Sequence, residues 1–263
     1  MQIKIDGRAV GLDLQGEGTP LVLMHAFPVD RSMFQFQVRE LAKIARVLTF
    51  DVPGMGESEA GPCSISDIAD LAARLLDEQG IDKAVVGGVS MGGYASFAFV
   101  RRHAQRLLGL VLADTKPEAD TDDAKKARRE MAAAAREQGS AEIAARMLPK
   151  LLGPTSLRER PEVVEGARSM ILRANPESIA RLLESLAQRD NATSLLAEIK
   201  APVLVIAGAE DAITPASAAK VWAQQIPNAK FVQIPQSGHL SNLETPGVFN
   251  FELQAFLSTV ATH

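Results

Sequence analysis

The chain has 263 residues, of which 46% are hydrophobic and 23% charged, and its formal net charge is −4. These proportions are typical of globular proteins and exclude collagen-like chains and disordered chains rich in Pro and Gly. The negative charge argues against nucleic-acid binding, because no broad basic surface is available to attract phosphates. At roughly 150 residues per domain, the length predicts one or two domains.

Cysteine usage and the N-terminus set expectations about location. Cys63 is the single cysteine, so no intrachain disulfide can form, which favours a reducing compartment. Residues 1–6 alternate like a strand and lack the basic start and apolar run of a signal peptide. No apolar run approaches the ~18 residues that a membrane-spanning helix needs. We therefore expect a soluble, cytoplasmic protein without a membrane partner.

Strands and helices alternate in the first part of the chain. Short apolar runs predict strands, and apolar residues at helical spacing predict the helices between them. This alternation predicts a mostly parallel sheet with helices on both faces. In chain order we expect a hairpin of strands 2–5 and 9–14, strand 21–25, helix 32–45, strand 46–50, helix 64–79, strand 83–89, helix 91–103 and strand 107–113.

The pattern changes between residues 116 and 200, where Ala, Arg, Glu and Leu dominate and no strand is predicted. One helix should begin at Asn175, with Asn as its cap and Pro176 in its first position. The alternation then returns with strand 202–207, helix 215–225 capped by Thr214, strand 230–234 and a closing helix 241–260. We therefore expect a core domain of residues 1–115 and 201–263, interrupted by a helical lid, 116–200.

The strongest chemical signal is Gly88-Val89-Ser90-Met91-Gly92, which fits G-x-S-x-G between a predicted strand and a predicted helix. This context predicts a tight, strained turn that projects the Ser90 hydroxyl above the sheet. The amide of Met91, at the start of the new helix, can then stabilise an oxyanion.

A serine nucleophile needs a base and a carboxylate that orients the base. His239 lies in a loop between the last strand and the last helix, and His25 follows a strand. Asp211 and Asp114 also follow strands, and loops at the carboxyl ends of parallel strands converge on one edge of the sheet. The order Ser90, Asp211, His239 is that of the α/β-hydrolases. Asp114, one strand earlier, remains the alternative acid.

Five segments together give the chain a resemblance to the α/β-hydrolase fold family over almost its whole length. The ending, residues 238–246, and the segment 187–190 are similar to 3-oxoadipate enol-lactonase-like hydrolases and small carboxylesterases. The five segments are His25–Pro28, Asp51–Ser58, Gly88–Gly93, Gly208–Pro215 and Ser237–Glu244.

The resemblance implies a role for each matching residue. Ser90 would be the nucleophile, His239 the general base and then acid, and Asp211 the orienting carboxylate. The backbone amides of Phe27 and Met91 would form the oxyanion hole. Ala26 departs from the pattern, because many relatives have glycine there, and alanine lacks the conformational freedom of glycine.

These features predict a serine hydrolase that cleaves carboxylic esters or lactones of small to medium acyl groups. Cofactor-free perhydrolysis or C–C bond hydrolysis at the same triad, and a slowly hydrolysing ligand sensor, remain alternatives. No phosphate-binding loop, dinucleotide fingerprint or metal-ligand spacing is present, so we expect neither cofactor nor metal. The sequence predicts no oligomeric state. Apolar residues of the lid are candidates for an acyl pocket, or for the lid's own core: Met131, Met147, Leu148, Leu151, Met170 and Ile171.

Overall fold

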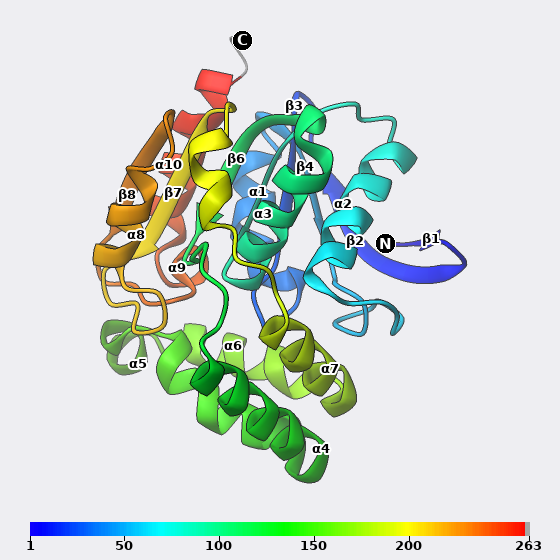
Figure 1. Cartoon of the computed structure of the whole chain (residues 1–263), viewed down its shortest axis with the longest axis vertical. Helices are drawn as coiled ribbons and strands as arrows, with labels where there is room; N and C mark the ends of the chain where they lie inside the picture. The colour runs from blue at the N-terminus through cyan, green and yellow to red at the C-terminus, as the bar shows by residue number, and fades with distance from the viewer. Residues whose placement is uncertain (261–263) are drawn as a thin grey trace.

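The computed structural model describes residues 1–260, and their centre is an eight-stranded sheet (Figure 1). The strand order is β1-β2-β4-β3-β5-β6-β7-β8. β2 runs antiparallel to β1 and β4, and every other neighbouring pair is parallel. The strands are β1 (Gln2–Ile5), β2 (Arg8–Gln15), β3 (Thr19–Met24), β4 (Ala45–Phe50), β5 (Ala84–Val89), β6 (Leu107–Ala113), β7 (Val203–Gly208) and β8 (Ala229–Ile234).

Helices cover both faces of this sheet, which explains why its central strands are continuous apolar runs. Every residue of β5 and of β7 is buried. α2 (Ile65–Glu78) packs on α3 (Met91–His103), and α1 (Gln35–Leu41) packs on α10 (Pro246–Val260). On α8 (Ala216–Ala223), Trp222 is buried and meets Phe97 of α3 edge to face. Trp222 therefore serves packing.

Helices alone fill the chain between β6 and β7, which we call the helical insertion. It comprises α4 (Asp122–Leu151), α5 (Pro154–Glu159), α6 (Pro161–Arg173), α7 (Pro176–Ala187) and a 3₁₀ segment, Thr193–Glu198. Figure 1 shows α4 to α7 grouped at one edge of the sheet, with α4 packed against α6 and α7. Asn175 caps α7 by accepting from the amides of Glu177 and Ser178, as predicted.

Three predicted helices differ from those observed. Helix 32–45 is shorter, because a 3₁₀ turn (Arg31–Phe34), capped by Asp30, precedes α1. Thr214 does not cap α8: Pro215 occupies that position, and the Thr214 hydroxyl bonds Asp211 instead. The closing helix is two helices, α9 (Ser241–Glu244) and α10, because a residue before proline disfavours helical angles and Thr245 leaves them. The last predicted core residues, 261–263, lie outside the described part.

Candidate active site

Ser90 stands at the turn between β5 and α3, with φ 54° and ψ −107°, a conformation that non-glycine residues seldom adopt. Its backbone is held from three sides, since its amide donates to the Ala113 carbonyl and its carbonyl accepts from Thr115 Oγ1 and the amides of α3. A Cβ on Gly92 would lie 1.9 Å from the Met24 carbonyl oxygen, so only glycine permits this approach. The predicted strained turn is therefore observed.

The Ser90 hydroxyl begins a chain of hydrogen bonds through His239 to Asp211. Ser90 Oγ lies 2.7 Å from His239 Nε2, and His239 Nδ1 lies 2.8 Å from Asp211 Oδ2. The three residues belong to different connections, after β5, β8 and β7, and they meet because those strands end at the same edge of the sheet. The structure thus joins three residues that are far apart in the sequence.

The hydrogen bonds around Asp211 fix its ionised form. Its Oδ1 accepts from the amides of Ile213 and Thr214, and its Oδ2 accepts from the Thr214 hydroxyl at 2.6 Å. Burial pushes the pKa of Asp211 upward, but the His239 charge and these hydrogen bonds outweigh it, so the pKa lies below its usual value. Burial likewise disfavours charged His239, yet the Asp211 carboxylate raises the pKa of His239 above the ordinary value of 6.5.

Asp114, the alternative acid, bonds to other groups. It follows β6 with φ 45°, accepts from the Gly208 amide at 2.8 Å, and accepts from the Ser241 hydroxyl at 2.6 Å. Complete burial and the nearby Asp211 charge raise the pKa of Asp114 to about 8. Asp114 therefore links the end of β7, which precedes Asp211, to the start of α9, which follows His239.

Glu244 is a buried carboxylate that the sequence analysis did not single out. Its Oε1 accepts from the amides of Gly238 and Leu240, on either side of His239, and its Oε2 accepts from the amide of Gly153 in the helical insertion. The His239 amide itself donates to the Leu151 carbonyl at 3.0 Å. The His239 loop is thus bound to the insertion. The signal present in the sequence was a carboxylate five residues after the histidine.

A small cavity of about 50 Å³ opens at the Ser90 hydroxyl. The backbone amides of Phe27 and Met91, expected to hold an oxyanion, belong to residues of this wall, and neither amide bonds another group in residues 1–260. Ala26 is not at positive φ, so alanine is unstrained there. The wall includes Phe27, Ser90, Met91, Met147, Leu151 and His239. It also includes four residues that were not predicted from the sequence: Tyr94, Arg128, Leu186 and Ile213.

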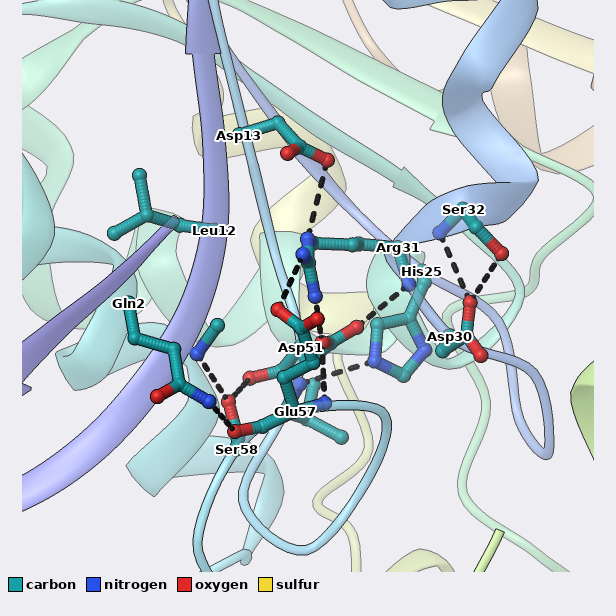
Figure 2. Close-up of polar contacts among 12 residues, drawn as sticks. Gln2, Leu12, Asp13, His25, Asp30, Arg31, Ser32, Asp51, Glu57 and Ser58 are labelled. Carbon is teal, nitrogen blue, oxygen red and sulfur yellow. Dashed lines mark hydrogen bonds and ion pairs between the residues drawn. The ribbon is translucent and has the colours of Figure 1, made fainter. Parts of the chain in front are cut away.

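His25 supports the segment that carries Phe27 and does not contact Ser90. Its Nδ1 lies 2.9 Å from the Ala26 carbonyl, and its Nε2 accepts from the Val52 amide at 3.0 Å. Figure 2 shows the neighbouring Arg31, whose guanidinium bonds three carboxylates: Asp13, Asp51 and Glu57. This network anchors the turn at residues 51–58.

Cys63 and His103 lie outside the cavity at Ser90. Cys63 is buried, and burial raises the pKa of its thiol, which disfavours the reactive thiolate. His103 ends α3 and its Nε2 lies 2.8 Å from Asp70, away from the Ser90 site.

In residues 1–260, no His, Cys, Asp or Glu cluster is arranged to hold a metal. Nor does any helix of that range combine the length and apolarity needed to cross a membrane.

The model of a known family matches residues 19–246, and that family is described as the alpha/beta hydrolase fold. This chain belongs to the alpha/beta hydrolase fold family. The hydrolase is 38% identical to a thermophilic esterase from Thermogutta terrifontis, with a TM-score of 0.97 and 99% of each chain covered. It is 28% identical to the enol-lactonase of Burkholderia xenovorans LB400, with a TM-score of 0.90 over 98% of this chain and 100% of that one.

A curated relative of this hydrolase is 3-oxoadipate enol-lactonase 2 of Acinetobacter baylyi, which is 28% identical over 245 residues. That alignment covers 92% of this chain and 90% of the relative. The hydrolase therefore resembles both esterases and enol-lactonases over nearly full length.

Proposed function

We propose that the protein is a serine hydrolase that cleaves carboxylic esters or lactones of small to medium acyl groups. The observation that carries the proposal is the continuous hydrogen-bonded chain from Ser90 Oγ through His239 to Asp211. Serine becomes a competent nucleophile only beside such an oriented base. The relatives named as esterases and enol-lactonases support the same pair of reactions.

In the proposed reaction, Ser90 Oγ attacks the ester carbonyl carbon while His239 Nε2 takes the hydroxyl proton. His239 Nδ1–H donates to Asp211, which holds the tautomer whose Nε2 lone pair faces Ser90. The carbonyl oxygen becomes an oxyanion and accepts from the amides of Phe27 and Met91.

As the tetrahedral intermediate collapses, the carbon–oxygen bond to the alcohol breaks and His239 gives its proton to that alcohol. In a lactone, the alcohol stays attached to the acyl group. His239 next takes a proton from water, whose oxygen attacks the acyl carbon, and then returns this proton to Ser90. The products are the acid and the free enzyme.

The helical insertion would act as a lid in this reaction. The cavity of about 50 Å³ is far below the roughly 300–1,000 Å³ of sites that hold a bound small molecule. Substrate entry therefore requires the walls from α4 and α7 to move away from Ser90. The mainly apolar wall favours small to medium acyl groups.

The test is hydrolysis of p-nitrophenyl esters of increasing acyl length, together with simple lactones followed by proton release. Ser90→Ala should lower kcat by about 10⁶-fold, because the nucleophile is lost while the oxyanion hole remains. Ser258→Ala, which removes an exposed hydroxyl on α10, is the matched control and should keep wild-type turnover. Near-normal turnover by Ser90→Ala, or no turnover of any ester or lactone by folded wild type, would contradict the proposal.

A further inference from the structure

Two arginines share one carboxylate beside the catalytic cavity. Arg128 Nε donates to Asp120 Oδ2, and Arg189 Nη1 lies 2.7 Å from Asp120 Oδ1. The side chains of Asp120 and Arg189 are each only 2% exposed, and that of Arg128 is 23% exposed. Asp120 and Arg128 lie at the start of the helical insertion and Arg189 lies just after α7, so the cluster joins the two ends of the insertion.

This cluster carries one more positive than negative charge. The pKa of Asp120 is lowered, since its hydrogen bond with Arg128 and the charges of both arginines overcome the effect of burial, so Asp120 is ionised. Two guanidinium groups and one carboxylate leave a net charge of +1. Arg31 is the contrasting case, because its single guanidinium bonds three carboxylates. Arg128 is the partly exposed member of the cluster, and a partly desolvated charge is favoured when an opposite charge pairs with it.

The side of the cluster that faces the cavity at Ser90 belongs to Arg128. The terminal nitrogens of Arg189 donate to Asp120 and to the carbonyls of Leu186 and Glu118, and its guanidinium stacks over the Tyr94 ring at 4.2 Å. Its Nε is buried without a hydrogen-bond partner in the described residues. In the described part of the chain, Arg128 donates only through Nε, so its Nη groups bond no protein acceptor. Arg128 lines the same cavity as Ser90, His239 and Tyr94.

We propose that Arg128 binds a carboxylate on the substrate, so that this hydrolase prefers esters or lactones whose acyl part carries a second, free carboxylate. The inference rests on the proposed function and adds a substrate class to it. The Nη groups of a guanidinium match the two oxygens of a carboxylate. Apart from His239, Arg128 is the charged side chain that the described residues contribute to the cavity wall. Its contact with a substrate carboxylate would therefore be the strongest polar contact made by the part of the substrate that does not react. Asp120 is held by its ion pair with Arg189, and it positions Arg128 through a second ion pair.

The experiment compares two nearly isosteric esters, monomethyl succinate and methyl levulinate, which differ by a free carboxylate in place of a methyl ketone. Monomethyl glutarate and monomethyl adipate extend the series, because the distance from Ser90 to the guanidinium sets the best chain length. For wild type, kcat/KM for the best anionic ester should exceed that for its neutral counterpart by about tenfold or more. A hydrogen-bonded charged partner contributes an effect of roughly 10–100-fold.

Arg128→Gln should lower this anionic-to-neutral ratio by about 10–100-fold, mainly through KM for the anionic ester. Arg129→Gln is the matched control, because it removes the same charge from the next, exposed residue of α4 and should leave the ratio unchanged. Arg128→Lys keeps the charge without the planar fork and should give an intermediate ratio. Thermal unfolding of each variant verifies that it is folded, and Arg128→Lys tests the proposal if Arg128→Gln does not fold.

The proposal is overturned if wild type shows no preference for any anionic ester, or if Arg128→Gln and Arg129→Gln change the ratio equally. A failure of the proposed function looks different, because neutral esters and lactones would also remain intact. In that event, calorimetric binding of monomethyl glutarate to Ser90→Ala decides the matter. Binding that Arg128→Gln weakens about tenfold or more supports the carboxylate site, whereas no binding, or equal binding, overturns it.

Discussion

The sheet edge and the helical insertion contribute different things to the same cavity. From the sheet edge come Ser90, Asp211 and His239, each on a connection fixed by backbone hydrogen bonds. From the insertion come Arg128 and apolar side chains such as Leu151, carried by helices that pack mainly on one another. In the proposed function, the sheet edge would perform the chemistry and the insertion would select the substrate.

Ser90→Ala, described above, has the largest expected effect on this comparison, and Asp211→Asn follows. Without the carboxylate, His239 loses its fixed tautomer, and kcat should fall by ~10⁴-fold. Asp114→Asn is the matched control, because Asp114 lies at the neighbouring strand end but bonds Gly208 and Ser241. Steady-state kinetics of both variants tests the assignment. A greater loss of kcat with Asp114→Asn would assign the orienting carboxylate to Asp114, after β6, in place of Asp211, after β7.

A change in the helical insertion should alter which acyl lengths the protein prefers. Leu151→Ala removes side-chain volume from the wall and so enlarges the cavity, while keeping the backbone carbonyl that accepts from the His239 amide. We expect the ratio of kcat/KM for hexanoate over acetate p-nitrophenyl esters to rise about tenfold, since each methylene accommodated contributes ~1–3 kcal/mol. Leu148→Ala, buried on the same helix but outside the cavity wall, controls for lost packing. An equal rise of the hexanoate-to-acetate ratio in both variants would show that the cavity wall does not determine the preferred acyl length.

The pH dependence of kcat/KM reports the charge of His239 in the free enzyme. His239 must be neutral to act as a base, and Asp211 raises its pKa above 6.5. Activity should therefore fall as pH decreases through a midpoint above 6.5. Asp211→Asn removes the stabilising charge and should lower that midpoint by about one unit. An unchanged midpoint in the variant would show that this titration does not arise from the His239–Asp211 pair.

Stability should show the smallest effect, through Asp114. Its folded pKa of about 8 exceeds the unfolded value near 3.8, so its contribution to stability is complete below 3.8 and disappears as pH rises to about 8. Asp114→Asn cannot ionise and escapes this loss. Between pH 5 and pH 7, urea unfolding should show the variant gaining about 1 kcal/mol or more over wild type. Parallel pH profiles for the two proteins would place the Asp114 pKa near its ordinary value.

Local sequence signals predicted much of the fold. The strands, the helical insertion and the cap at Asn175 followed from apolar spacing and from Asn and Pro positions that act within a few residues. The failures occurred where a tertiary contact overrode such a signal. Thr214 has the side chain of a helix cap, but Asp211 takes its hydroxyl. The closing helix breaks at Thr245 because Pro246 follows, a local signal that the long apolar pattern concealed.

The sequence alone determined which residue types stand in the strained turn and in the loops after the strands, because G-x-S-x-G and the strand–helix alternation are local patterns. It left Asp211 and Asp114 both open as partners of His239, since both follow strands. The tertiary structure joined His239 to Asp211 and Asp114 to Ser241. It alone brought Asp120, Arg128 and Arg189 together, because the ends of the insertion meet only once its helices have packed.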